Sequence, residues 1–301
     1  MQLHNLALSL MAASPVLSKE MRCGNVDDFL PQHEASQLSM RIRQTFPAPA
    51  PVNLTIHIIA GSESRQDGYL LAEEVDEQVQ VIKDLFKPIG ITFNHTNAHN
   101  RWVVNPLWAG HRVTPSTIFD DMKSALHVGD YRTLNLYFRN ITVADYGGVC
   151  TNPVSEAQKQ PDLQKRLLLD GCVINRITVP GSGHPFMSQG KTAVHEMGHW
   201  FGLFHPFHDN DLRENDTNPD PCSPTNPDDH VLDTPKMAYT EGMVGTCNLE
   251  LNSCPNAEGN DPVRNYMSWS SDECMNEFTR GQTARIYEIW AKYRMNAIIV
   301  A

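Results

Sequence analysis

Three histidines and one glutamate stand close together in the stretch HEMGHWFGLFH, residues 195–205. Residues four apart on an α-helix share one face, so His195 and His199 can direct two imidazoles at one ion. Neutral imidazole is a good zinc ligand. Gly202 lets the chain leave the helix sharply, because glycine tolerates positive φ, and this turn can bring in His205 as a third ligand. Three protein ligands leave a fourth position for water, which is typical of a catalytic zinc site.

Glu196 follows the first of these ligands and can reach such a water. Zinc lowers the pKa of a bound water toward about 7, so a carboxylate can take its proton. The same carboxylate can then return the proton to the leaving amine of a peptide bond. The motif therefore predicts a zinc hydrolase with Glu196 as the catalytic base. The alternative is a helix whose histidines are ordinary surface or core residues.

The elements that must position this motif can be predicted from periodicity. Apolar residues recur at helical spacing between 68 and 86, and short β-branched runs predict strands. Strands are expected at 54–59, 91–93, 133–138, 147–153 and 172–179, and helices at 68–86, 116–126, 189–204 and 279–294. Alternating strands and helices favour an α/β half with a mixed sheet, in which strand 147–153 forms the edge that pairs with an extended substrate. An irregular stretch rich in Pro, Asp and Asn follows at 206–264.

Between His199 and His205 the motif contains apolar residues that we expect to pack on the sheet rather than to take part in chemistry. These residues are Trp200, Phe201, Leu203 and Phe204.

The chain resembles the metzincin clan of zinc metalloproteases in two segments. The first is the histidine motif, and the second is NYMSW, residues 265–269, which resembles the Met-turn of that clan. Within the clan the chain is most similar to the pappalysin family, and especially to its fungal extracellular metalloproteases. The segments LDTP at 232–235 and FTRGQ at 278–282 carry this likeness, which covers most of residues 50–296.

The resemblance implies an α+β fold, the metzincin catalytic domain. It has a twisted mixed sheet of five strands with helices, an active-site helix and an irregular C-terminal subdomain. It also implies a zinc endopeptidase whose Met267 forms an apolar floor under the histidines without binding the metal. The implied disulfides join Cys150 to Cys172, Cys222 to Cys254, and Cys247 to Cys274.

One position departs from the family pattern. Relatives have Tyr two residues after the Met of the Met-turn, where it helps to stabilise the tetrahedral intermediate, and this chain has Trp269. An indole can donate a hydrogen bond but cannot bind a metal. We therefore expect reduced rather than abolished activity. Tyr266 is nearby, but the resemblance gives it a structural role.

The N-terminal residues predict targeting and latency segments. The apolar stretch at 6–17, with Val16 and Ser18 at the −3 and −1 positions, predicts a signal peptide over 1–18. Residues 19–47 read as a prosegment, because Arg41 and Arg43 precede a Pro/Ala-rich hinge. The catalytic domain is expected at 48–301, divided into subdomains at 48–205 and 206–301. The alternatives are a frayed tail and a disordered extension.

Cys23 is the cysteine left over from the three pairs. Its surroundings, MRCGNVD at 21–27, resemble the cysteine-switch segment of matrix metalloprotease prosegments, although both prolines of that motif are absent. A thiolate would occupy the fourth position on zinc and exclude water. The alternative is a spare cysteine.

Several features predict a secreted protein. Seven cysteines are typical of an oxidising compartment. Acceptor patterns for N-glycans occur at Asn53, Asn94, Asn140 and Asn215.

Composition limits the partners. A net charge of −11 argues against nucleic acid, and no apolar run is long enough to span a membrane. We expect a monomer that acts on proteins or peptides. An acidic loop favours a structural calcium, with a solvated loop as the alternative. Its carboxylates are Asp209, Asp211, Glu214, Asp216, Asp220, Asp228, Asp229 and Asp233.

Two other functions compete with an endopeptidase. One is a zinc-binding protein without activity, favoured only by Trp269. The other is a zinc hydrolase of small amides, since fold and metal alone do not decide the substrate.

Overall fold

The computed structural model describes residues 21–23, 46–110, 117–141, 146–153, 163–208, 220–223 and 229–295. The predicted signal peptide at 1–18, most of the predicted prosegment and Asn215 lie outside these residues. The described strands are β1 (Met21–Cys23), β2 (Val52–Ala60), β3 (Phe93–Asn94), β4 (Asn100–Val104), β5 (Thr133–Arg139), β6 (Tyr146–Cys150), β7 (Cys172–Asn175), β8 (Phe207–His208) and β9 (Met237–Ala238). The described α-helices are α1 (Ala72–Phe86), α2 (Pro106–Ala109), α3 (Thr117–Leu126), α4 (Leu163–Leu169), α5 (Lys191–Trp200) and α6 (Arg280–Ile289).

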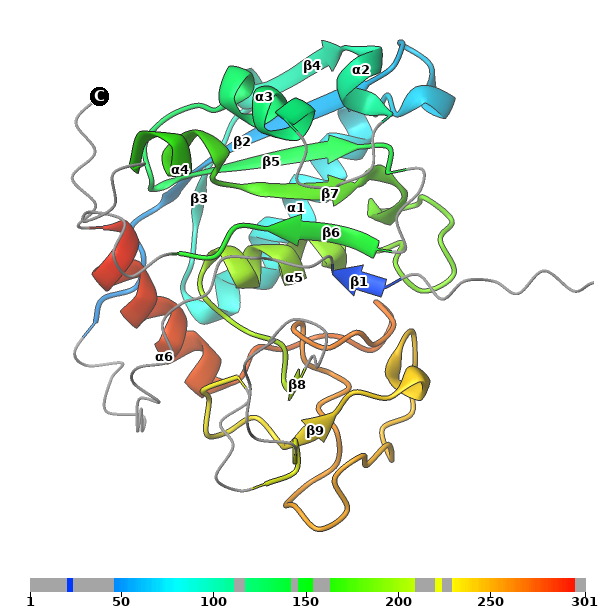
Figure 1. The fold of residues 1–301 in the computed structure, drawn as a ribbon, viewed down its shortest axis with the longest axis vertical. Helices are drawn as coiled ribbons and strands as arrows, with labels where there is room; N and C mark the ends of the chain where they lie inside the picture. The colour runs from blue at the N-terminus through cyan, green and yellow to red at the C-terminus, as the bar shows by residue number, and fades with distance from the viewer. Residues whose placement is uncertain are drawn as a thin grey trace, which may run out of the picture.

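A mixed sheet forms the upper half of the molecule (Figure 1). Its order is β1-β6-β7-β5-β2, and β3 and β4 both pair with β2, at different parts of its length. Strands β7, β5, β2, β3 and β4 are parallel, whereas β6 runs antiparallel to β7. The predicted mixed sheet is confirmed, with two additions. Strand β4 pairs with β2, and β1, from the predicted prosegment, pairs with β6, so that β1 and not the predicted strand 147–153 forms this edge of the sheet.

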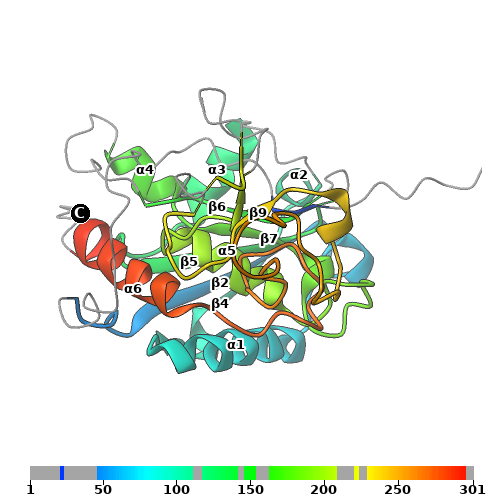
Figure 2. The ribbon, with the colours of Figure 1, turned by 90° about the horizontal axis from the view of Figure 1, so that it is seen from below.

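Helices cover both faces of this sheet (Figure 2). Helices α1 and α5 lie on one face and α3 and α4 on the other. The main core lies on the α1 side, where Phe86, Phe201 and Trp290 pack together with residues of β2 and β5. Two layers of helices around a sheet bury the apolar strands on both sides, which explains why β5 is buried along its whole length.

Helix α1 is shorter than the predicted helix at 68–86. Gly68 has φ 100°, so it ends a short 3-10 turn instead of opening the helix. The helix begins after Leu71, whose N–H donates to the carboxylate of Glu74 at 2.8 Å. Leu71 is therefore exposed, whereas the other four apolar residues of the predicted face are buried: Val75, Val79, Ile82 and Phe86.

Other boundaries differ because side chains and glycines end the elements early. The predicted strand at 172–179 ends at Asn175. The side-chain amide oxygen Oδ1 of Asn175 accepts a hydrogen bond from the N–H of Ile177 and caps a 3-10 turn over Arg176–Thr178. The helix predicted at 189–204 spans only Lys191–Trp200. The closing helix changes from α to π geometry at Trp290–Arg294. Strand β4 and helices α2 and α4 were not predicted, because they are short and lack a clear apolar period.

The described part of 206–264 is irregular, as predicted, and contains the two-residue strands β8 and β9 and a 3-10 turn at Glu241–Met243. Figure 1 shows α6 running from the lower half of the molecule back toward the sheet. The hydroxyl of Tyr287 donates to the carbonyl of Ile89 at 2.6 Å and ties α6 to the end of α1. No helix in the described parts of the chain is long and apolar enough to cross a membrane.

Candidate active site

Helix α5 carries the histidine motif through the centre of the molecule and is buried from Thr192 to Trp200. It ends where Gly202 takes φ 93°. A Cβ at Gly202 would lie 2.6 Å from Ile289, so this turn needs glycine for both its conformation and its packing. The turn returns the chain toward the helix, and the N–H of Leu203 donates to the carbonyl of Gly198 at 2.9 Å.

The three predicted ligands meet at one point. The Nε2 atoms of His195 and His199 are 3.2 Å apart, and each lies 3.1 Å from Nε2 of His205. All three side chains are buried. Nδ1 of His195 lies 2.7 Å from the carbonyl oxygen of Tyr266, and Nδ1 of His199 lies 2.9 Å from that of Leu203. Carbonyls only accept, so these Nδ1 atoms donate and the neutral rings present Nε2 lone pairs to one another.

The geometry of this triangle fits a metal ion. Tetrahedral zinc with Zn–N bonds of about 2.0–2.1 Å separates its ligand nitrogens by roughly 3.3 Å, close to the distances found. Burial lowers the pKa of His199 to about 4, so this ring is neutral at neutral pH, as a metal ligand must be. No other group of three potential ligand side chains within the described residues is as close together.

The Met-turn lies directly beneath α5. Met267 is fully buried, and a Cβ at Gly198 would collide with its sulfur atom. The N–H of Met267 donates to Oδ1 of Asn265, whose amide exchanges two hydrogen bonds with Gln282 of α6. The helix therefore needs glycine at position 198, and α6 holds the turn in place.

Tyr266 contributes its backbone to the site. Its carbonyl orients His195, while its ring packs against Phe278 with centroids 4.8 Å apart. Burial raises the pKa of its hydroxyl to about 12. The side chain thus lies in the core, and the carbonyl does the positioning.

Trp269 lies beside the third histidine. Its Nε1 is 3.3 Å from Nε2 of His205, and the two rings meet edge to face with centroids 5.3 Å apart. Phe207 stacks on the imidazole of His205 at 4.7 Å and 9°. The indole N–H is therefore aimed at the nitrogen that faces the metal position. Phe207 was not recognised in the sequence, because an apolar residue after the motif resembles ordinary core.

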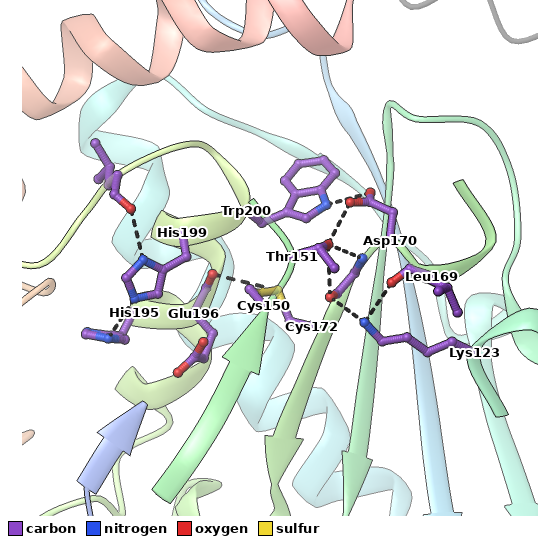
Figure 3. The surroundings of a disulfide bond; sticks show 12 residues. Lys123, Cys150, Thr151, Leu169, Asp170, Cys172, His195, Glu196, His199 and Trp200 are labelled. Atoms are coloured by element: carbon purple, nitrogen blue, oxygen red, sulfur yellow. Dashed lines mark hydrogen bonds between the residues drawn. A yellow bond between two sulfur atoms is a disulfide. The ribbon is translucent and has the colours of Figure 1, made fainter. Parts of the chain in front are cut away.

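Glu196 is fully buried where α5 packs against β6. Gly148 of β6 lies against it: a Cβ on this glycine would be 2.6 Å from Cγ of Glu196 and 3.1 Å from Oε1. Figure 3 shows the Glu196 side chain on the same side of the helix as His195, near the cysteines that join β6 to β7. The site thus places a carboxylate next to the first histidine.

Three disulfides join Cys150 to Cys172, Cys222 to Cys254, and Cys247 to Cys274. These are the pairs that the resemblance implied. The first lies under α5, where Sγ of Cys172 is 3.7 Å from the carbonyl oxygen of Glu196. The other two close loops of the irregular lower half.

The remaining predicted residues lie apart from the histidines. Asn53 and Asn94 are exposed and face each other across β2 and β3, and Asn140 is half-buried after β5. Most residues of the acidic loop lie outside the described residues. Asp233 instead accepts hydrogen bonds from the hydroxyl of Thr279 and the N–H of Gly281 at the start of α6.

Comparisons with known proteins agree with this site. Residues 173–291 match the model of peptidase family M43, described as pregnancy-associated plasma protein-A. Extracellular metalloprotease 1 of Coccidioides posadasii is 34% identical over 299 residues, which are 95% of this chain and 94% of the relative. An extracellular metalloprotease of Podospora anserina is 36% identical over 250 residues, 82% of this chain and 75% of the relative.

Solved structures show the same fold. Mature mirolysin of Tannerella forsythia, in complex with a cleaved peptide, covers 83% of this chain and 97% of its own, with TM-score 0.59 and 23% identity. Mirolysin in complex with compound 9 covers 84% and 98%, with TM-score 0.60 and 22% identity. The metzincin fold is therefore confirmed. The relatives' identity and coverage show that the chain belongs to peptidase family M43 and is a zinc metalloendopeptidase.

Proposed function

We propose that this protein hydrolyses peptide bonds in other proteins by means of a water that Glu196 activates. The observation that carries the proposal is the buried triangle of Nε2 atoms, 3.1–3.2 Å apart, with Glu196 next to its first member. Bound at His195, His199 and His205, zinc would lower the pKa of a water and polarise the substrate carbonyl.

The chain's own residues supply the remaining chemistry. The carbonyls of Tyr266 and Leu203 hold two ligand rings in one tautomer and orientation. Glu196 accepts a proton from the attacking water and delivers it to the leaving nitrogen of the substrate. The N–H of Trp269, aimed at the same point, can donate to the oxygen that becomes negative in the transition state.

The first experiment compares casein or gelatin hydrolysis by the secreted, processed protein and by Glu196→Ala, with zinc content measured on both. We expect cleavage by the wild type only, with about one zinc in each, because Glu196 is not a ligand. A Glu196→Ala variant as active as the wild type would overturn the assignment of the base. A panel of small amides run in parallel distinguishes a peptidase from a small-amide hydrolase.

We also propose that the protein is made as a zymogen. The observation that supports this proposal is β1, which pairs in parallel with β6 and sets the α-carbon of Cys23 opposite Gly148. Gly148 lies against Glu196, so the prosegment backbone reaches the active site. A strand there occupies the edge to which an extended substrate would add.

Replacing the thiol tests the cysteine switch. The unprocessed Cys23→Ser protein should cleave casein faster than the unprocessed wild type, because a hydroxyl is a far weaker zinc ligand than a thiolate. Its activity should stay below that of the processed protein, because β1 would still cover β6. Latency equal to that of the wild type would remove Cys23 as the blocking group.

Secretion and the domain boundaries are part of the same proposal. The relatives are named extracellular metalloproteases, and a secreted form that begins at residue 19 and is processed near 48 would agree with signal and prosegment cleavage. Mass spectrometry of the secreted protein would measure both ends, and would also show whether Asn53, Asn94, Asn140 and Asn215 carry glycans.

We further propose that the protein is a monomer that acts on protein substrates, and sedimentation would measure its oligomeric state. We also propose a structural calcium in the acidic loop, and an unchanged melting temperature after calcium removal with zinc retained would reject it.

A further inference from the structure

Gly148 stands where strand β6 passes Glu196. A Cβ at this position would lie 2.6 Å from Cγ, 3.0 Å from Cδ and 3.1 Å from Oε1 of Glu196. The contact is with the side chain and not with the backbone of α5. The Glu196 side chain therefore fills the space in which any residue other than glycine would carry its first side-chain atom.

Strand β6 is held against α5. Glu196 and Gly148 are both buried. Two residues beyond Gly148, Cys150 is joined to Cys172 of β7, and the sulfur of Cys172 lies 3.7 Å from the carbonyl oxygen of Glu196. Figure 3 shows this disulfide next to the turn of α5 that carries Glu196. The disulfide holds β6 close to the helix, so an added side chain at 148 would displace the carboxylate rather than the strand.

We propose that Gly148 is a positioning residue, whose missing side chain lets the β6 backbone hold the Glu196 carboxylate toward the three histidines. This inference rests on the proposed role of Glu196 as the base. A catalytic group must be placed closely, because a shift of about 1 Å can lower the rate roughly 100-fold. The backbone of β6 that would pair with a substrate is not itself changed by an added methyl group.

The test is Gly148→Ala, with Gly110→Ala as the matched control. Gly110 has φ −107°, which alanine adopts, and among the described residues its added Cβ would come no closer than 3.6 Å, to the carbonyl oxygen of Pro106. We expect kcat of Gly148→Ala to fall about 10- to 100-fold, with KM within about twofold and zinc content unchanged. Gly110→Ala should match the wild type. Wild-type kcat in Gly148→Ala would overturn the proposal.

A melting-temperature cycle tests the contact without relying on activity. Gly148→Ala should lower Tm in the wild-type background and leave it unchanged in the Glu196→Ala background, where the obstructing atoms are gone. An equal loss of Tm in both backgrounds would place the collision elsewhere and overturn the proposal. Absence of peptidase activity in the wild type would instead overturn the proposed function, while the two Tm differences would still report on the contact.

Discussion

Trp269 is the residue that most distinguishes this site from the family pattern. The resemblance to the family places a tyrosine here, and the structure places an N–H donor 3.3 Å from the metal-facing nitrogen of His205. Because a metal would take that nitrogen's lone pair, the N–H becomes available to a substrate oxygen once the metal is bound. We therefore expect Trp269 to take the stabilising role that the resemblance gives to tyrosine at this position in the sequence.

Two substitutions distinguish the contribution of the aromatic ring of Trp269 from that of its N–H donor. Trp269→Phe keeps an aromatic ring without an N–H, and kcat should fall roughly 10- to 100-fold while KM changes little. Trp269→Tyr restores the family's hydroxyl and should raise kcat/KM above that of the wild type. Steady-state kinetics on one peptide substrate measures both. A Phe variant as fast as the wild type would show that the N–H takes no part, and a Tyr variant no faster would show that Trp269 does not limit the rate.

At the residue scale, the spacing of His195, His199 and Gly202 was sufficient to predict a converging triad. The partners that orient the rings could not be predicted. Two of them are backbone carbonyls, at Tyr266 and Leu203, and every residue has a carbonyl. The carbonyl of Leu203 is only four residues from His199, but that of Tyr266 lies in a turn 71 positions from His195, which only the folded chain brings under the helix.

The element that links the irregular half to the rest is the N-terminus of α6. Thr279 caps this helix with its hydroxyl, and Gln282 completes a capping box. Asp233, from the segment at 232–235 that resembles the family's DTP motif, adds a second cap: Oδ1 accepts from Thr279 at 2.7 Å and Oδ2 from the N–H of Gly281 at 2.9 Å. A carboxylate at a helix N-terminus also interacts favourably with the helix dipole.

Removing this cap should weaken the attachment of the irregular half to α6 without changing the three histidines. Asp233→Ala loses both hydrogen bonds, and we expect the free energy of unfolding to fall by about 1 kcal/mol. Glu250→Ala, an exposed acidic residue of the same half, is the control and should change stability by less than about 0.5 kcal/mol. Chemical denaturation of both variants measures the difference. Equal effects would mean that Asp233 has no special role as a cap.

Elements with a strong period were predicted well, and short ones were not. Strand β5 and helix α3 begin within one residue of the expected positions, because their apolar patterns are clear. Helix α5 is shorter than predicted because apolar residues continue past Trp200 into the turn, where Phe201 and Leu203 are still buried. Periodicity alone does not distinguish a buried turn from a helix.

At the scale of the whole molecule, hydrogen bonds in the interior of the protein hold the end of the described chain. Arg294, fully buried, donates from Nη1 to Oδ2 of Asp170 at 2.9 Å and from Nε to the carbonyl of Trp200 at 3.0 Å. Asp170 also accepts from Trp200 Nε1 and from the hydroxyl of Thr151, and Figure 3 shows these three residues together. The sequence predicts a closing helix that ends at Arg294, but nothing in it pairs Arg294 with Asp170.

This anchor predicts that the closing helix stabilises the whole fold through one buried ion pair. Arg294→Met leaves the Asp170 carboxylate buried beside two neutral donors, and the free energy of unfolding should fall by about 3–5 kcal/mol. Lys292→Met is the control, because the Lys292–Glu288 pair in the same stretch is partly exposed and is worth less than about 1 kcal/mol. Adding Asp170→Asn to Arg294→Met should recover part of the loss, since it removes the unpaired charge. Equal small losses in Arg294→Met and Lys292→Met would show that the end of the chain is not held by this pair.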